Sequence, residues 1–276
     1  MMEKPILVLF AALVSASMFT PAAPAPQDPL AHAIPSVSAV TYHVVDTMQI
    51  SVQSPMGPVD ITASASATLT AGFEEAPGGF RATAELTDFS GSATNPMGGA
   101  QSMGSEAFSG AIVVVVGPTG VTELVATPEP SPMAGQFSLF EGMGYDLFPG
   151  LPARAVAAGD TWNDTFTWSA SVDGGEMTTT VARSFTMGEE TVVDGRSLQT
   201  IALSATVEIS ASSNQGGMNA SQTFEGTVTG HYYWDSAAGL LHSAELVRDY
   251  EGQATIPGMP PVPMAMKGPQ RIVRAN

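Results

Sequence analysis

The chain has no cysteine, few basic residues and a small share of charged residues of either sign. Without cysteine it cannot form disulfides, thiolate nucleophiles, cysteine-ligated zinc or iron–sulfur centres, and it cannot carry a lipid on an N-terminal cysteine. Only 9 of its 276 residues are Lys or Arg, against 26 Asp and Glu, which gives a net charge of −17. The basic residues are scattered, so we expect no nucleic-acid partner, because such binding needs clustered cations.

The sequence also lacks the usual catalytic and metal-binding motifs. It contains no H-E-x-x-H, no D-x-D-x-D-G calcium loop and no G-x-S-x-G. The four histidines, at positions 32, 43, 231 and 242, stand in no recognisable frame with Ser or Asp. We therefore predict no catalytic residue, no metal and no cofactor, and keep an unrecognised hydrolase as the alternative.

An export signal is indicated at the N-terminus. Lys4 precedes an apolar run of 13 residues, 6–18, and small residues follow it. The run is too short to span a bilayer but is typical of a signal peptide. We predict a signal over 1–25, a flexible Pro-rich leader over 26–38 and a single β domain over 39–276. The protein would reach the periplasm or the exterior with no transmembrane span in the mature chain; an N-terminal membrane anchor is the alternative.

Strand-like alternation dominates the rest of the chain. Over 59–71, apolar and polar residues alternate strictly, which predicts a half-buried strand. Further strands are expected at about 42–52, 79–89, 107–116, 120–127, 161–172, 176–187, 197–211, 222–234, 240–256 and 267–274. Tight turns such as "GPTG" and "DG" join neighbouring strands and make them antiparallel. The expected fold is all-β, with one large curved antiparallel sheet forming a half-barrel.

The inward faces hold many small residues, which leaves two interpretations open. Either something bulky packs over these alanines or they line a cavity. They are Ala63, Ala65, Ala67, Ala71, Ala82 and Ala84.

Residues 128–160 are rich in Pro and Gly and break the alternation. Within them a helical stripe is formed by Met133, Phe137, Phe140, Met143 and Leu147. We predict a short helix or loop over the open face of the sheet. The segment bridges two similar halves, about 40–127 and 161–274. Phe108-Ser-Gly110 is matched by Phe224-Glu-Gly226, and Glu123-Leu-Val by Glu245-Leu-Val, which indicates an internal repeat.

The stretch "GHYYWDSAAGLLHSAEL" (230–246) concentrates aromatic residues and histidines in one hairpin. Alternation predicts that Tyr232 faces His242 and that Trp234 faces Leu240 on the apolar side. The hairpin either fills the core or lines a cavity with a polar end. The residues that would line such a cavity are Phe137, Phe140, Met143, Trp168, Tyr232, Trp234 and His242.

The stretch "LFPGLPARAVAAGDTW" (147–162) resembles a family of secreted bacterial β proteins that has no assigned chemistry. The family shares an FPxLP…VxxGDxW pattern, matched here by Phe148, Pro149, Leu151, Pro152, Val156, Gly159, Asp160 and Trp162. The architecture also looks like the half-barrel carriers of lipoprotein localisation, an analogy at the level of the fold. From the residues alone, Gly159 and Asp160 form a tight turn and Trp162 faces the core.

Two functions fit these expectations. The first is a carrier that binds a lipid or another apolar ligand inside the half-barrel without catalysis. The second is a structural or interaction module that docks an envelope protein through its sheet edges or through the Pro-rich segment 256–266.

Overall fold

The computed structural model describes residues 28–54, 57–95, 99–130, 142–172, 175–215 and 218–275. The strands are β1 (Ala39–Ser54), β2 (Gly57–Ala76), β3 (Gly79–Asn95), β4 (Gly99–Met103), β5 (Phe108–Ser109), β6 (Ala111–Gly117), β7 (Gly120–Ala126), β8 (Glu129–Pro130), β9 (Thr161–Val172), β10 (Gly175–Val193), β11 (Arg196–Gln215), β12 (Met218–Asp235), β13 (Leu240–Thr255) and β14 (Val262–Arg274). The helical elements are a 3₁₀ turn, η1 (Ser105–Ala107), and α1 (Met143–Leu147).

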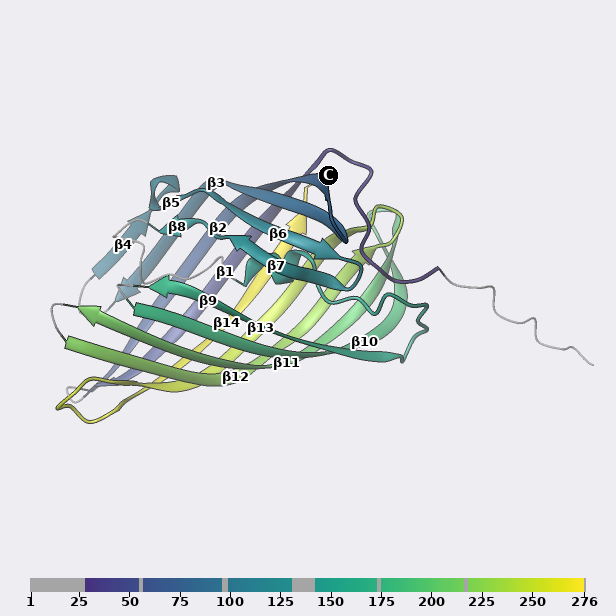
Figure 1. Cartoon of the computed structure of the whole chain (residues 1–276). Helices are drawn as coiled ribbons and strands as arrows, with labels where there is room; N and C mark the ends of the chain where they lie inside the picture. Colours follow the sequence, from purple (N-terminus) through teal and green to yellow (C-terminus); the bar gives the residue numbers. More distant parts are fainter. Residues whose placement is uncertain are drawn as a thin grey trace, which may run out of the picture.

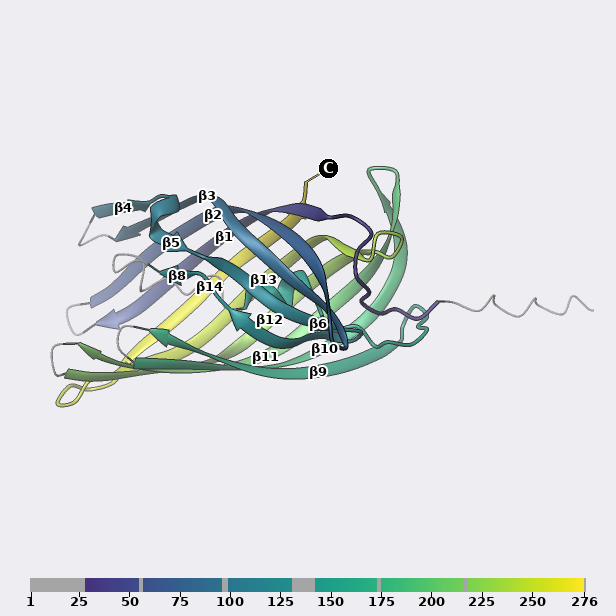
Figure 2. The same ribbon diagram turned by 45° about the horizontal axis from the view of Figure 1, so that its top comes forward.

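One 12-stranded antiparallel sheet makes up the fold, with the order β7-β6-β3-β2-β1-β14-β13-β12-β11-β10-β9 and with β4 paired to β3. β14 pairs with both β1 and β13, so the last strand lies beside the first. Figures 1 and 2 show that the sheet curls into a nearly closed barrel. The seam lies between the edge strands β7 and β9, which do not pair. The predicted all-β curved sheet is confirmed.

The strands keep the predicted alternation, with one apolar face turned inward. On β1, Tyr42 and Val44 are buried, whereas His43 and Val45 are exposed. The outer face is dominated by hydroxyl side chains, many of which pair across strands. Such pairs are Thr41–Thr70, Ser64–Ser92, Thr167–Thr180 and Ser169–Thr178, with oxygens 2.8–3.2 Å apart. The outside is therefore polar although it carries few charges.

The main core fills one end of the barrel, which we call the packed end. This end carries the turns at 77–78, 118–119, 194–195 and 236–239 and lies to the right in Figure 1. Side chains with 0–1% exposure here include Tyr42, Leu69, Phe80, Phe185, Ile201, Tyr232, Trp234 and Leu241. The opposite end, which we call the far end, carries the 256–261 loop.

The predicted bridge enters this core. Met143, Leu147, Phe148 and Leu151 are at most 3% exposed. A Cβ on Gly144 would stand 2.8 Å from a Val114 side-chain carbon, so α1 lies very close to β6. The helix begins at Met143, and the Met133, Phe137 and Phe140 part of the predicted stripe lies outside the described residues.

The small inner residues are mostly covered by protein. Exposure is 9% or less for Ala63, Ala67, Ala71, Ala82 and Ala84, while Ala65 is half-buried. Over this part of the sheet, the structure therefore favours bulky groups packed on the alanines over a cavity lined by them.

The segment 256–266 was expected to be an extended docking segment. Its second part is instead strand: Val262, Pro263, Met264, Ala265 and Met266 belong to β14 and pair with β13, and the last three also pair with β1. Only the 256–261 loop remains outside the sheet.

Candidate functional site

A row of directly paired residues crosses six strands on the inner face. Asp164 on β9 pairs with Arg183 on β10, and the row continues through Ala205, Val228 and Arg248 to Gly268 on β14. Between the two arginines lie the small side chains of Ala205 and Val228. We call this set, together with Asp46 and Asp146, the charged row.

Arg183 is held rigidly at one end of the charged row. Its Nε and Nη2 donate to the two Asp164 carboxylate oxygens at 2.8 and 2.5 Å, and Nη1 donates to the Tyr145 carbonyl at 3.1 Å. The guanidinium lies 4.6 Å from the centre of the Phe166 ring and 5.2 Å from that of Phe185. Because the side chain is only 4% exposed, the bidentate carboxylate compensates for the loss of water around the cation.

At the other end, Arg248 forms an ion pair with Asp46 on β1. The arginine reaches across β14, where its directly paired neighbour is Gly268 and no side chain intervenes. Asp46 is 6% exposed in its side chain and pairs across strands with Gln270. The pair therefore lies inside the fold, and its partners satisfy each other's charge.

Asp146, on α1, lies between these two ion pairs. Tyr232 donates its hydroxyl to the Asp146 carboxylate at 3.3 Å. Burial raises the pKa of Asp146 to about 6, although the positive charges of Arg183 and Arg248 act in the opposite direction. Burial and the Asp146 charge together raise the pKa of Tyr232 well above its ordinary value. The carboxylate thus has cations near it but no ion-pair partner of its own among the described residues.

Beyond the charged row the inner surface is mostly apolar, with the buried Thr179 as a polar exception on β10. Val207, Phe224 and Tyr250 form a separate buried cluster, with Val181, Ile209, Val228, Met264 and Met266 half-buried around it. Phe224 lies on Gly252 and Tyr250 lies on Gly226, at positions where a Cβ would come within 2.5 Å of each ring. Met48, Ile50 and Val52 on β1 are also half-buried. This end offers apolar surface that the described chain does not fully cover.

A pocket of about 460 Å³ opens at the seam of the barrel. It is bounded by the start of β7, by the segment after α1 and by the first half of β9, and Arg183 and Asp164 line it. The Trp162 indole donates to the Gly150 carbonyl at 2.9 Å and fixes that segment beside β9. Asp160 caps the turn before β9 by accepting from the Ala157 amide at 3.1 Å, as the sequence predicts.

The predicted cavity residues are dispersed. Met143, Tyr232 and Trp234 are at most 2% exposed and belong to the packed end, where Tyr232 reaches Asp146 through its hydroxyl. Trp168 is half-buried on the far half of β9. Phe137 and Phe140 lie outside the described residues.

The predicted register of the aromatic hairpin is wrong. Trp234 pairs with Leu241 because the turn shifts the register by one residue from the prediction, and a bulge in β13 then adds one more residue, so that Tyr232 pairs with Ala244. His242 is the added residue and does not face Tyr232. It is 5% exposed, and its Nδ1 lies 3.2 Å from the Ser243 hydroxyl. Burial, with the positive charges of Arg274 and Arg196, lowers its pKa.

The histidine that packs on Trp234 is His32, from the segment before β1. Its ring lies edge-on to Trp234 and Phe148, with centroids 5.0 and 6.1 Å apart. His32 Nε2 donates to the Pro149 carbonyl at 2.7 Å, and burial lowers its pKa to about 4. Leu30 beside it forms an antiparallel bridge with Arg154. The segment from Leu30 to His32 therefore seals the packed end.

Sequence reasoning also missed the charged row, although a signal was present. Asp46, Arg183 and Arg248 each occupy an inward position of an alternating strand, flanked by apolar residues two positions away. Charged residues at core positions are rarely tolerated without a partner, so each marks a buried interaction.

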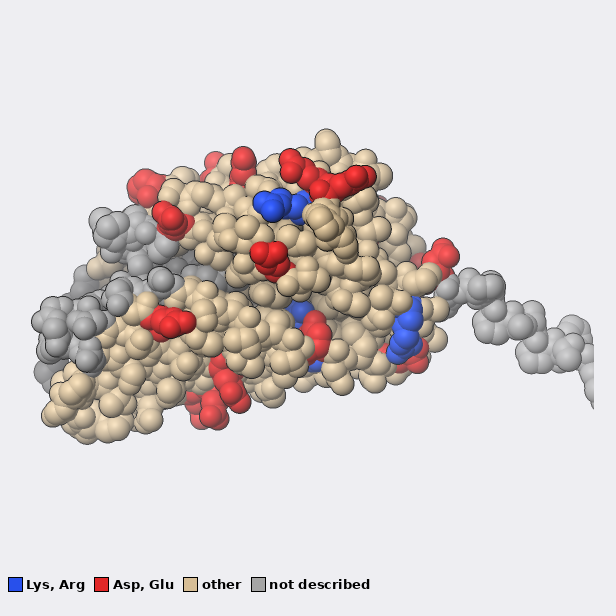
Figure 3. All heavy atoms as spheres, viewed as in Figure 1, with Lys and Arg blue, Asp and Glu red and all other residues tan. Residues whose placement is uncertain are grey.

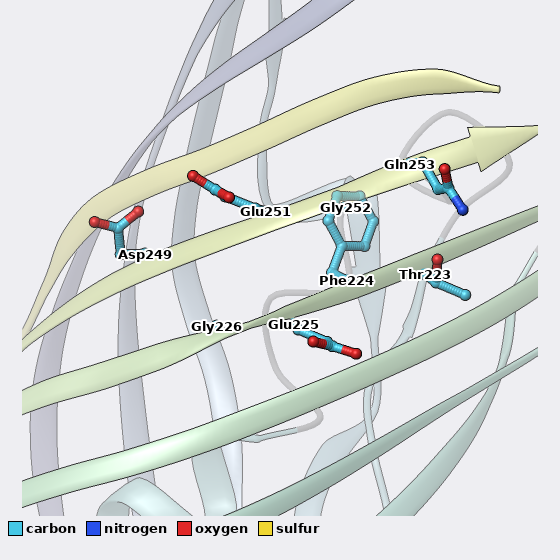
Figure 4. Close-up of a pocket in the computed structure, with 8 residues that line it drawn as sticks. All are labelled: Thr223, Phe224, Glu225, Gly226, Asp249, Glu251, Gly252 and Gln253. Carbon is cyan, nitrogen blue, oxygen red and sulfur yellow. The ribbon is translucent and has the colours of Figure 1, made fainter.

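A second pocket of about 680 Å³ lies over β12 and β13. Figure 4 shows its carboxylates, Glu225, Asp249 and Glu251, spread along the two strands without converging on one centre. Within the described ranges no group of three acidic or histidine side chains could hold a metal ion. Figure 3 shows acidic side chains scattered in the same way over the face it displays.

In the described part of the chain, no helix has the length and hydrophobicity needed to cross a membrane. No protein-family model matches the chain, and no significant match was found among curated proteins or solved structures. The proposal below therefore rests on the geometry and, for export, on the N-terminal sequence.

Proposed function

We propose that the protein is an exported envelope protein that binds or carries a lipid or another apolar ligand in the far half of its barrel, without catalysis. The observation that carries the proposal is the half-buried apolar inner surface at the far end, enclosed by an outer face of hydroxyl groups. Uncovered apolar surface inside a fold is costly, at about 25 cal/mol per Å². An alkyl chain placed there removes that surface from water together with its own.

The residue types at the far end suit an adaptable ligand. Met48, Met264 and Met266 are unbranched and polarizable, so they can adjust to chains of different shape. Ile50 and Val52 add branched apolar surface on the same strand as Met48. The protein is therefore expected to accept ligands whose apolar parts differ in length and shape.

The test begins with the purified full-length protein. Extraction with chloroform and methanol followed by mass spectrometry is expected to release a stoichiometric lipid. The delipidated protein should then bind N-phenyl-1-naphthylamine with increased fluorescence. Recovery of no lipid, together with no uptake of the dye, would contradict the proposal.

Two variants on β1 locate the binding surface. Ile50→Gln places an amide on the half-buried inner face and is expected to weaken dye binding several-fold. Val45→Gln makes a similar change on the outer face, where the side chain is 52% exposed, and should leave dye binding unchanged. Equal losses in both variants would place the dye elsewhere.

A specific observation also favours protein–protein interaction as a second candidate. β9 ends the sheet order, so in the described part of the chain one edge of its 12 residues has no strand partner. It contains no Lys or Pro, the residues that commonly block pairing at an edge. Crosslinking in envelope extract should capture one stoichiometric partner through β9 if this candidate holds. Replacing Thr167 by Pro should then abolish capture.

A further inference from the structure

The charged row contains one more carboxylate than it has cations. Asp46 and Asp164 are each paired with an arginine, at Arg248 and Arg183. Asp146 is the third carboxylate, and within the part of the chain that the structure describes it accepts a side-chain hydrogen bond from Tyr232 and forms no ion pair. When Asp146 is ionised, the row carries one uncompensated negative charge between two neutral ion pairs.

A ligand can approach the charged row from the side of Arg248, whose side chain is 16% exposed. Asp146 is half-buried as a whole residue, and protein surrounds its carboxyl group. The apolar far end lies immediately beyond, because Arg248 and Tyr250 are successive inward residues of β13. A ligand whose chain occupies the far end therefore has its head at the charged row.

Resting on the proposed function, we propose that the ligand is an amphiphile whose head group carries a positive charge, and that this head binds against Asp146. An alkylammonium is the simplest such molecule. It would neutralise the row, whereas an anionic head would add a second uncompensated charge in a poorly solvated space. The alkyl chain of the ligand makes the apolar contacts, and Asp146 selects for a positively charged head group.

The groups that face Asp146 come from five strands: Asp46, Asp164, Arg183, Tyr232, Arg248 and Tyr250. Binding of a cation requires the ionised form of Asp146. Because burial places the pKa of this carboxyl at about 6, affinity for a permanent cation is expected to rise between pH 5 and pH 7. The affinity for a ligand with a neutral head group should not change between pH 5 and pH 7.

The experiment uses three probes that carry the same decyl chain and differ in head group: decyltrimethylammonium, decanesulfonate and decyl glucoside. Each displaces N-phenyl-1-naphthylamine from the delipidated full-length protein, below its micelle concentration and in 0.3 M salt. That salt screens attraction of cations to the acidic surface. The cation is expected to bind about tenfold more tightly than the other two probes at pH 7, as one charge-assisted contact provides.

Two matched variants test whether Asp146 causes the preference for the cationic probe. Asp146→Asn should remove the preference for the cation and its pH dependence while leaving decyl glucoside binding intact. Asp249→Asn makes the same chemical change on the outer face, beside Lys267, and should change cation affinity less than twofold. Equal binding of the cation and the sulfonate at pH 7, or an unchanged preference in Asp146→Asn, would overturn the inference while the proposed function stands. If none of the three probes displaces the dye, the proposed function itself fails.

Discussion

The two ends of the barrel use the same strands but bury them differently. On β1, Tyr42 and Val44 at the packed end are 1% and 4% exposed, while Ile50 and Val52 towards the far end are half-buried. All four face inward. The difference comes from what lies opposite: the packed end faces α1 and the segment from Leu30 to His32, which fill the barrel there. Alternation therefore defines an inward face, but packing partners decide how completely that face is buried.

The charged row marks the boundary between these two ends. Its Arg183 donates to the carbonyl of Tyr145 on α1, and its Arg248 is followed on the inward face of β13 by Tyr250 of the far apolar cluster. Buried ion pairs contribute little net stability compared with apolar packing, so the charged row adds less to the stability of the fold than the packed end does.

The largest contrast should be in stability. Trp234→Ala at the packed end is expected to lower the free energy of unfolding by about 3 to 5 kcal/mol, because it leaves a cavity in a full core. Met266→Ala at the far end should cost about 1 kcal/mol, because its side chain is already half-buried. Urea denaturation of both variants measures the difference. Similar losses would show that the far end is packed as tightly as the other.

Acid should weaken the packed end through His32. Its pKa is about 4 in the folded protein and about 6.5 when unfolded, so the unfolded chain binds the proton more readily. Stability should therefore fall as pH decreases from about 6.5 to 4, by up to about 3 kcal/mol. His32→Gln should flatten the stability curve over this range, whereas His231→Gln, on an exposed side chain, should not. An unchanged slope in His32→Gln would show that the ring is accessible to solvent.

At the boundary, Asp146→Asn should raise stability at neutral pH. The pKa of Asp146 is higher in the folded state than the ordinary 3.8, so ionisation opposes folding. The protonated form of Asp146 favours the folded state. This contribution is full below about pH 4 and is lost as pH rises through about 6. The variant should gain about 1 to 3 kcal/mol over the wild type at pH 7 and little at pH 4. Thermal unfolding at both pH values tests this, and a loss of stability at pH 7 would contradict it.

Much of the fold could be predicted because strand signals are local. The bounds 161–172 expected for β9 are those observed, and β7, β11 and β13 differ by a few residues at most. Several strands run past their predicted ends, among them β2, β3, β10 and β14, and the added parts of β3 and β14 contain Gly91 and Pro263. Those residues weaken a strand signal but are tolerated when neighbouring strands supply the pairing.

The site was predicted less well because it depends on long-range register. A turn placed one residue differently and a bulge after it together moved His242 away from Tyr232, and no local pattern announces such an insertion. His32 was unassigned because its contacts with Phe148 and Trp234 join residues more than a hundred positions apart. Asp146 was overlooked in a segment whose helix is only five residues long.

The sequence by itself determined the all-β class, the antiparallel order of neighbouring strands and the polar outer face, because each follows from residues adjacent in the chain. Only the tertiary structure decided that β14 joins β1, that Asp146 lies between Arg183 and Arg248, and that one end of the barrel is full while the other is not. These features depend on which distant surfaces meet, and the free energy of that meeting is shared among many weak contacts that no short stretch of sequence encodes.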